Sequence, residues 1–412
     1  MSGSERDGVF ADLVGQERVV EELRLAVRAA AGVGATGAAP ADAAVPGAPA
    51  RSRSAETGRG MTHAWMFTGP PGSGRSTAAL AFAAALQCPD QGCGHCKECH
   101  TALIGSHADV DVVRTDALSI GVKETRDLVR RSALTPAGPG WQVIVLEDSD
   151  RLTEQAVNVL LKAIEEPPRR TVWLLCVPST EDLAPTIRSR CRLVVLRTPP
   201  AAAVADLLVR RDGINPAMAA YAAAASQGHV GRARRLALDE RARLRRQDVL
   251  RVPSALQHLP ACFTAAANIV EAAAEEAREA TGESDAEETR AMRRALGEGP
   301  GTRGLARGSA GVIADLERRQ KARATRQQRD GLDRALVDLA SFYRDVLVVQ
   351  LGASVELVNE ADRPAVEGAA RAGTPAATLR RLEAVLACRE SLAVAVAPLL
   401  AVEALTVELL AG

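Results

Sequence analysis

The sequence predicts an α/β nucleotide-binding domain, built on a parallel sheet with helices on both faces, followed by a second half that is helical throughout. Three observations support this prediction: a phosphate-binding loop at residues 69–76, strand and helix signals that alternate up to residue 197, and no strand signal from about residue 200 onward. Short apolar strands separated by helices are typical of parallel sheets that are buried on both faces. Since a domain usually spans about 100–200 residues, this length predicts roughly two to four domains.

The glycine-rich run at residues 69–76 reads Gly-Pro-Pro-Gly-Ser-Gly-Arg-Ser. Its spacing matches G-x-x-x-x-G-K-S/T, in which backbone N–H groups surround phosphates, a Lys reaches the outer phosphates and a hydroxyl binds Mg²⁺. Residues 65–68 before it predict a buried strand and residues 77–86 after it predict a helix, which is the context that the motif needs. The candidate ligand is therefore ATP or ADP with Mg²⁺. The residues predicted to bind it are Gly69, Gly72, Gly74, Arg75, Ser76 and Thr77.

Arg75 is the departure from this motif, because it stands where the motif has Lys. Arg keeps the positive charge but presents a planar fork in place of a compact ammonium, and the two are not interchangeable. The loop therefore predicts a nucleotide-binding fold while leaving open whether this chain still binds or turns over nucleotide. The alternative is a turn rich in Gly and Pro that has no ligand.

Four of the eight cysteines, Cys88, Cys93, Cys96 and Cys99, lie close together with two glycines between them. This spacing is typical of a structural zinc site in which four thiolates surround the ion tetrahedrally. Disulfides are the alternative, and a reducing compartment disfavours them. The two flanking histidines are expected to face solvent beside a complete set of four thiols. The other four cysteines are expected to be small apolar side chains of the core.

The remaining strands are predicted at four short apolar runs: residues 110–114, 142–146, 172–177 and 193–196. Helices are predicted at residues 122–132 and after Thr153, where apolar residues recur at helical spacing until Pro167. Residues 31–60, rich in Ala, Gly, Pro and Ser, predict a disordered surface insert. The charged span at about 277–330 predicts a second flexible insertion, with a solvated helix as the alternative.

Charge and hydropathy narrow the class of protein. The 51 Lys and Arg balance the 51 Asp and Glu, so the net charge argues neither for nor against a polyanionic partner. No apolar run is long enough and free enough of charges for a membrane span, and residues 1–30 carry acids where a signal peptide would have an apolar core. We expect a cytoplasmic protein that makes no contact with a membrane.

Residues 148–168, DSDRLTEQAVNVLLKAIEEPP, and residues 186–191, TIRSRC, resemble the bacterial clamp-loader subunits of the AAA+ family. A four-cysteine zinc module after the phosphate-loop helix belongs to the same group. The resemblance covers residues 9–240 closely and the remainder only as a helical collar. It implies an AAA+ domain at 1–197, with the insert at 31–60 and the zinc module at 88–100, a helical lid at 198–240, and a helical collar or oligomerisation domain at 241–412.

The resemblance also implies a function. It identifies a subunit of the DNA polymerase III holoenzyme, a DNA-directed DNA polymerase, which takes part in ATP-dependent loading of the sliding clamp onto primed DNA during chromosomal replication. The implied partners are the clamp-loader ATPase subunits of the tau/gamma type, the delta subunit and the sliding clamp. Primed DNA would be reached through the assembled hetero-oligomer.

Several catalytic positions of the family are altered here. In an active subunit the second acidic motif ends Asp-Glu, the Asp positioning Mg²⁺ and the Glu orienting water. Here the pair is Glu147-Asp148, so the carboxylate at the water position is one methylene shorter, and a misplacement of about 1 Å can cost about a hundredfold in rate. The family's sensing Thr falls near Val177 or Pro178, and its lid Arg falls on Gly231. We expect little or no ATP hydrolysis by this chain.

One catalytic element of the family is intact. Ser189-Arg190-Cys191 matches the motif whose Arg reaches a neighbouring subunit's ATP and stabilises the charge on the transferring phosphoryl group. We predict that Arg190, in preference to Arg188 or Arg192, has this catalytic role in trans. The alternative is a solvated basic cluster at the start of a strand.

A possible DNA contact lies on the helix predicted at residues 122–132. Lys123, Arg126 and Arg130 fall on one face of it, and such a face can follow a phosphate backbone without reading sequence. In the clamp-loader family the corresponding helix faces primer-template DNA. Because Glu124 and Asp127 interleave with these cations, a solvated helix face is an equal alternative.

Three functions stay open. The first is a clamp-loader subunit with weak or no hydrolysis, which Arg75, the Glu147-Asp148 pair and Gly231 favour. The second is an active AAA+ ATPase, a motor subunit of the tau/gamma type. The third is a zinc-ribbon module that binds nucleic acid and keeps a relic nucleotide-binding core, although the intact motif around Arg190 would then have no use.

Overall fold

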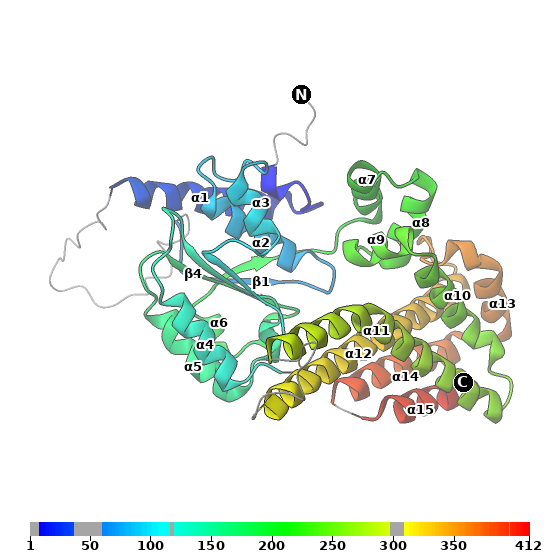
Figure 1. Cartoon of the computed structure of the whole chain (residues 1–412). Coiled ribbons are helices and arrows are strands. Elements are labelled where there is room, and N and C mark those ends of the chain that lie inside the picture. Colours follow the sequence, from blue (N-terminus) through cyan, green and yellow to red (C-terminus); the bar gives the residue numbers. More distant parts are fainter. Residues whose placement is uncertain (1–7, 37–59, 116–118, 297–308, 395) are drawn as a thin grey trace. The chain divides into compact units, whose positions relative to one another are not determined.

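The computed structural model describes residues 8–36, 60–115, 119–296, 309–394 and 396–412. They form two compact units that divide between Arg234 and Arg235 (Figure 1). The first contains the sheet and the sites predicted above, and the second is helical. Among the described residues no helix is long and apolar enough to cross a membrane.

A five-stranded parallel sheet forms the centre of the first unit. Its strands lie in the order β2-β3-β4-β1-β5, so β1 is flanked by β4 and β5, and Phe67 is in register with Cys176 on one side and Val194 on the other. The strands are β1 (Ala64–Thr68), β2 (Val110–Val113), β3 (Gln142–Leu146), β4 (Thr171–Val177) and β5 (Arg192–Val195). Every predicted strand is present, and the predicted parallel α/β class is confirmed.

Helices cover both faces of this sheet (Figure 1). One face carries α1 (Glu17–Thr36) and α2 (Arg75–Gln87), with α3 (Lys97–Leu103) beside α2; the other carries α4 (Val122–Ser132), α5 (Glu154–Glu165) and α6 (Pro185–Arg188). Successive side chains of a strand point to opposite faces. In β1, Trp65 therefore packs under α2, with its ring centroid 4.9 Å from that of Phe82, while Met66 packs with Leu160 and Ile164 of α5.

The first unit also contains α7 (Ala201–Asp212), α8 (Pro216–Ser226) and the beginning of α9 (Val230–Leu238), which the division after Arg234 crosses. The lid was predicted at 198–240; below, the lid means residues 198–234, the part of it that lies in the first unit. Gly213 ends α7 in the left-handed conformation, and the Asn215 side chain accepts a hydrogen bond from the Ala217 N–H at the start of α8. These caps fix the short connection between the first two lid helices.

The expected insert at residues 31–60 is corrected at its beginning, because α1 continues to Thr36. Residues 29–31 are consecutive alanines, which have the highest helix propensity, and the buried face of α1, which includes Leu23 and Val27, anchors the preceding turns. Residues 37–59 lie outside the described residues.

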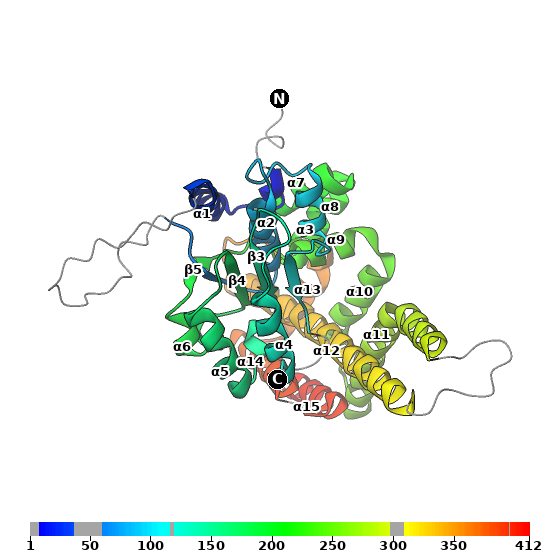
Figure 2. The same cartoon turned by 60° about the vertical axis from the view of Figure 1, so that its left-hand side comes forward.

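The second unit is a set of helices around one apolar core. They are α10 (Glu240–Ala255), α11 (Leu259–Ala295), α12 (Ser309–Gln350), α13 (Arg363–Ala372), α14 (Pro375–Ala393) and α15 (Pro398–Ala411), with a short 3-10 helix, η5 (Glu360–Asp362), before α13. Leu332, Leu336 and Leu339 of α12 recur at helical spacing and are almost fully buried in this core. Helix α11 lies alongside α12 in both views (Figures 1 and 2).

A buried polar network ties three parts of the second unit together. Arg246 of α10 is 3% exposed, and its Nε lies 2.9 Å from Asp338 Oδ1 of α12. Its guanidinium also donates to the Asn359 side chain, whose Nδ2 donates to Asp345 Oδ2 at 2.8 Å. Buried charges are tolerated when they are paired and hydrogen-bonded, so this network fixes the register of α10, α12 and the loop before α13.

The span at 277–330, expected as a flexible insertion, is helical wherever the structure describes it. Residues 277–295 continue α11 and residues 309–330 begin α12, so the alternative of a solvated helix applies to them. Its mixed charges are arranged as pairs between the two helices: Arg323 of α12 lies 2.8 Å from Asp285 and 3.1 Å from Glu288 of α11. Residues 297–308 lie outside the described part of the chain.

Candidate functional site

The phosphate-binding loop lies between β1 and α2, at the carboxyl end of strand β1. Gly72 and Gly74 have φ of 84° and 91°, in the left-handed region that favours glycine. Gly74 is the residue before the first turn of α2, and Ser76 and Thr77 lie within that turn. The backbone of the motif is therefore present where the sequence predicted it, with the N–H groups of a helix start next to the loop.

The side chain at the Lys position is turned back onto the loop. The Arg75 guanidinium donates through Nη1 to the carbonyl oxygen of Gly69. Burial lowers the pKa of Arg75, and the nearby Asp148 carboxylate is among the groups that oppose this shift. Ser73 Oγ, in the middle of the loop, is buried and has no hydrogen-bond partner among the described residues. The loop thus holds an internally bonded cation and one unsatisfied hydroxyl.

The acidic pair follows β3 directly. Glu147 Oε2 lies 2.9 Å from Arg114 Nε, while Glu147 Oε1 is buried without a partner among the residues that the structure describes. Asp148 Oδ1 lies 3.9 Å from Arg151 Nε. The structure therefore brings both carboxylates to the expected end of the sheet, and each is paired with an Arg of this chain.

A lid residue that the sequence did not single out lies against the loop. A Cβ on Gly72 would stand 2.5 Å from Cα, Cβ and Cγ of His229, so the two residues are in closest contact. A Cβ on Gly231, where the lid Arg of the family was expected to fall, would lie 3.4 Å from His229 Cε1. His229 thus lies close to both Gly72 of the loop and Gly231 of the lid. Its pairing with Gly72 joins residues 157 positions apart, for which a single sequence carries no signal.

A cavity of about 90 Å³ lies beside the loop. Ligand-binding pockets usually measure about 300–1,000 Å³, so in this arrangement the cavity does not accommodate a whole nucleotide. It is lined by the following residues: Asp12, Leu13, Val14, Gln16, Gly72, Ser73, Gly74, Thr77, Pro199, Arg211 and Val230. The lid and the segment at 12–16 therefore close over the phosphate loop.

One ion pair joins the lid to Asp12, and two further pairs lie within the lid. Arg211 of α7 lies 3.1 Å from Asp12 and 3.2 Å from Asp212, and Arg234 of α9 lies 3.0 Å from Asp212. Burial raises the pKa of Asp212, but hydrogen bonds and charge from Arg211 and then Arg234 outweigh it and leave the pKa below its usual value. None of these residues belongs to the motif, so sequence reasoning missed them.

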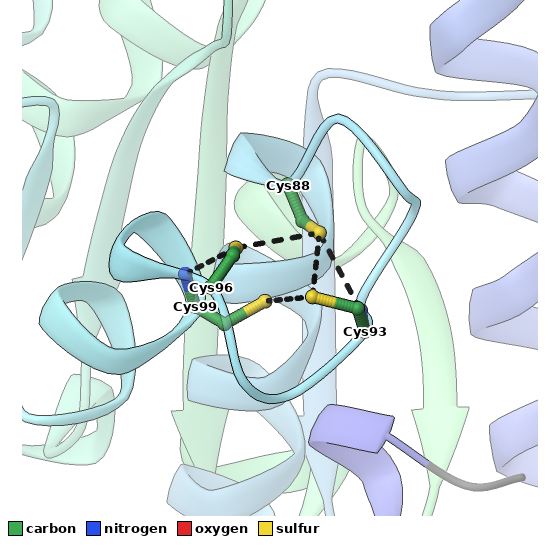
Figure 3. A group of neighbouring side chains, drawn as sticks. All are labelled: Cys88, Cys93, Cys96 and Cys99. Atoms are coloured by element: carbon green, nitrogen blue, oxygen red, sulfur yellow. Dashed lines mark hydrogen bonds between the residues drawn. The ribbon is translucent and has the colours of Figure 1, made fainter.

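The four clustered cysteines converge on one point (Figure 3). Their sulfur atoms all lie within 4.8 Å of one another, with Cys88–Cys93 at 3.6 Å, Cys88–Cys96 at 3.7 Å and Cys93–Cys99 at 4.0 Å. Four thiolates at about 2.3 Å from a tetrahedral zinc ion would be about 3.8 Å apart. The cluster can therefore hold a metal ion, and its spacing fits zinc ligation, whereas a disulfide needs about 2.05 Å.

Two helix ends position these thiols. Cys88 follows the last turn of α2, and Cys96 precedes α3, where its sulfur accepts the Cys99 N–H at 3.4 Å. His95 and His100 are exposed and stand outside the cluster, as expected. The other described cysteines are separate and free, and three of them, Cys176, Cys262 and Cys388, are buried.

The thiols differ in acidity. Hydrogen bonding, first of all from the His95 backbone, lowers the pKa of Cys93 to about 6. Burial raises the pKa of the Cys99 thiol well above its usual range. Thiolates are the form that ligates metal, so a bound cation would have to offset the cost of ionising Cys99.

Arg190 lies between α6 and β5 with its side chain 40% exposed. Its Nη1 donates to the Thr186 carbonyl at 2.8 Å, and its Nη2 lies 2.7 Å from Glu165 Oε1 at the end of α5. The guanidinium is therefore at the surface and held by groups of this chain.

The neighbouring arginines differ from it. Arg192 lies 2.8 Å from Glu22 of α1 and stacks over the Trp65 ring, 4.8 Å from its centroid. Arg188 donates to the Thr180 carbonyl at 3.3 Å. Arg192 is thus held by contacts within the domain. Compared with Arg192, Arg190 is more available to a neighbouring subunit.

The basic face predicted on α4 is present. Lys123, Arg126 and Arg130 are exposed, and Arg130 pairs with Asp127 at 3.3 Å. An acid therefore partly compensates one of the three cations, and the geometry does not choose between a DNA contact and a solvated face.

Comparisons with known proteins find that the sheet unit is similar to subunits of DNA polymerase III. Residues 51–200 match the protein family described as DNA polymerase III, delta subunit. The chain is 36% identical over 163 residues to DNA polymerase III subunit delta' of Pseudomonas aeruginosa, covering 38% of this chain and 50% of that protein. It is 30% identical over 211 residues to subunit gamma/tau of Mycobacterium tuberculosis, covering 50% of this chain and 31% of that protein.

The chain thus spans 31% to 50% of the length of these relatives. A solved gamma subunit-related protein of Thermotoga maritima is 16% identical, with a TM-score of 0.34, over 68% of this chain and 94% of that one. The sequence matches confirm the predicted resemblance to clamp-loader subunits of DNA polymerase III, of the delta-prime kind.

Proposed function

We propose that this chain is a clamp-loader subunit of a bacterial DNA polymerase III holoenzyme, of the delta-prime type, that supplies Arg190 to the ATP site of a neighbouring subunit. Its own site hydrolyses ATP weakly or not at all. The complex would load a sliding clamp onto primed DNA in the cytoplasm, and the Ala- and Arg-rich composition with long inserts resembles an actinobacterial version. The partners would be tau/gamma-type ATPase subunits, a delta subunit and the clamp.

The observation that carries the proposal is the contrast between two arginines. Arg75, in the chain's own phosphate loop, is bonded to the Gly69 carbonyl beneath a closed lid. Arg190 is at the surface, paired only weakly with Glu165, since an exposed ion pair contributes about 0–1 kcal/mol. A phosphate group of a neighbour's nucleotide carries more charge than one carboxylate and can displace it.

The four-thiol cluster would hold structural zinc through Cys88, Cys93, Cys96 and Cys99. When bound, the ion cross-links the ends of α2 and α3. Because four thiols leave no open coordination position, the site is suited to stability and not to catalysis.

The test is a pair of substitutions in the reconstituted complex. Arg190→Ala should leave this chain folded and assembled while lowering the DNA- and clamp-stimulated ATPase, because in-trans arginines contribute on the order of 10³–10⁵ in rate at the one site that they serve. The total rate should fall only in part, because other sites keep their own arginines, and clamp loading should fall further. The control is Arg188→Ala, which removes a nearby surface charge and should change neither rate.

The second candidate is an active motor of the tau/gamma type. It is favoured by the match to a gamma/tau subunit over 211 residues and by the hydroxyls of Ser76 and Thr77 in the first turn of α2. In that case Arg75→Ala would abolish clamp loading and Arg190→Ala would have no effect, the reverse of the result that we expect.

A further inference from the structure

The segment Gly8–Gln16 packs against the loop that carries Cys93 and also lines the cavity beside the phosphate loop. We propose that metal binding at the cluster and nucleotide binding at the phosphate loop are linked through this segment, which the metal-bound module holds in place as one wall of the cavity. The inference rests on the proposed metal and nucleotide sites and goes beyond them, since it couples two sites at opposite ends of α2.

At the cluster, the segment packs backbone against backbone. The Val9 N–H donates to the Gly92 carbonyl at 3.1 Å. A Cβ on Gly94 would lie 2.9 Å from the Gly8 carbonyl carbon, and one on Gly8 would lie 2.0 Å from the Gly92 oxygen. The loop that carries Cys93 therefore fits the segment without space for a side chain, so the shape of the loop decides whether the segment can dock.

At the cavity, the same segment supplies side chains. Leu13 and Gln16 line the cavity beside the phosphate loop. The Gln16 amide donates to the Ser73 carbonyl at 3.4 Å and to the Arg197 carbonyl at 2.6 Å, and its oxygen accepts the Arg197 N–H at 3.2 Å. Gln16 is 4% exposed, so it is a buried and hydrogen-bonded part of the cavity wall.

The residues between these contacts are short and internally bonded. A 3-10 helix, η2 (Gly8–Phe10), is followed by a turn in which the Leu13 N–H donates to the Phe10 carbonyl at 3.0 Å. Val9 and Phe10 are buried in the same apolar cluster as Cys88 and Cys99. A displacement at one end is therefore transmitted to the other, and linkage requires that each ligand change the affinity of the other by the same factor.

The first experiment compares the full chain with and without metal. After zinc is removed with a chelator under reducing conditions, the backbone amides of residues 9–13 should exchange hydrogen at least about tenfold faster while those of β3 and β4 stay protected, and the dissociation constant for ADP should rise by about threefold or more. Unchanged exchange at residues 9–13 after the metal has left would overturn the inference.

A variant separates the linkage from the metal site itself. Gly8→Ala places a methyl group against the Gly92 carbonyl and leaves all four thiols intact, so the chain should keep its zinc and still show fast exchange at residues 9–13 and weakened ADP binding. Gly352→Ala is the matched control, because Gly352 has a similar φ of 61° with open space around its Cβ.

The outcomes identify which proposal fails. A wild-type chain that takes up no zinc contradicts the metal site. The metal content is measured before hydrogen exchange, so this outcome is known first. A wild-type chain that binds no ADP overturns the linkage but leaves the role of Arg190 untouched. A Gly8→Ala chain that behaves like Gly352→Ala overturns the linkage while both sites stand.

Discussion

The two ends of helix α2 carry two candidate ligand sites, which differ in how completely the structure assembles the expected side chains. At its carboxyl end, four side chains of one chemical type converge at distances that fit a metal ion. At its amino end, the loop has the backbone of a phosphate site, but the cation at the Lys position bonds to the loop itself. Backbone conformation, which glycines and a helix start specify locally, is thus retained where the side-chain chemistry has changed.

The difference extends to what holds each end together. The phosphate loop is closed by backbone hydrogen bonds, from the Ser73 N–H to the Pro70 carbonyl within the loop at 3.0 Å and from the Gly69 N–H to the Pro178 carbonyl after β4 at 3.3 Å. In the cysteine loop, sulfur atoms accept the N–H groups of Cys93, Gly94 and Cys99, in addition to backbone bonds such as the one from the Gln91 N–H to the Cys88 carbonyl at 3.1 Å. We therefore expect the cysteine end to depend on its ligand for stability and the phosphate end to be stable without one.

The largest expected effect is the loss of a thiol. Cys96→Ser should release the metal and loosen residues 88–100, because structural zinc supplies apparent binding free energies on the order of 10 kcal/mol to the fold of its site. Elemental analysis of the purified protein and thermal unfolding would measure both effects. Cys388→Ala, which removes a buried thiol outside the cluster, should keep a full complement of metal. A Cys96→Ser protein with one tightly held zinc per chain would contradict the assignment.

The next effect tests whether the lid closes the phosphate loop. Gly72→Ala should destabilise the first unit by about 1–3 kcal/mol, because its Cβ would stand 2.5 Å from His229 and its φ of 84° strains any L residue. Denaturant unfolding would measure the loss.

Gly231→Ala is the matched control for that change. Its Cβ would meet His229 at 3.4 Å, and Ala favours the helix, so stability should be unchanged or raised by up to about 1 kcal/mol. If the two variants unfolded alike, the contact between His229 and the loop would not hold in solution.

The sequence predicted the fold well because its signals are local. Each strand is a short apolar run between helix or turn signals, and the N-cap Thr153, whose side chain accepts the Ala156 N–H, begins α5 as expected. The cysteine cluster was predictable for the same reason, since its four ligands lie within one loop. The difference between the two sites could be predicted only in part. The sequence shows Arg75 at the Lys position, but it does not show the hydrogen bond from Arg75 to the Gly69 carbonyl.

What sequence reasoning missed depends on residues that are far apart in the chain. Gln16 bonds to Arg197 across 181 positions, and Arg211 reaches Asp12 across 199. The span at 277–330 was expected to be flexible because its charges, read along one chain, look solvated; in its described part, Arg323 of α12 pairs with Asp285 of the neighbouring helix α11. Pairing of this kind comes from tertiary structure, which one sequence does not specify residue by residue.

A smaller effect concerns the ion pairs that Asp212 makes within the lid. The folded-state pKa of Asp212 is lowered, so its pairs contribute free energy above the unfolded pKa of about 3.9 and lose it as pH falls through the folded-state value. Asp212→Asn should therefore cost about 1 kcal/mol or less at pH 7, because water reaches Arg211 and Arg234 and screens the pairs. The difference from wild type should shrink as the pH falls through the lowered folded-state pKa of Asp212. A difference that stays undiminished as the pH is lowered would show that charge is not its cause.

The smallest expected effect concerns the residue at the Lys position of the phosphate loop, at the amino end of α2. Arg75→Lys restores the ammonium that the motif calls for, yet ATP turnover by the isolated chain should stay within about twofold of background. In the alignment that we propose, Asp148 stands at the water-activating position, where a shift of about 1 Å costs about a hundredfold, and Gly231 stands where the family has its lid Arg. Phosphate release at saturating ATP and Mg²⁺ would measure this, with Arg75→Ala as the control for contaminating activity. If Arg75→Lys alone produced saturable turnover that Arg75→Ala lacked, this one substitution would be enough to make the phosphate loop catalytic. The chain would then have to be regarded as an ATPase acting at its own site.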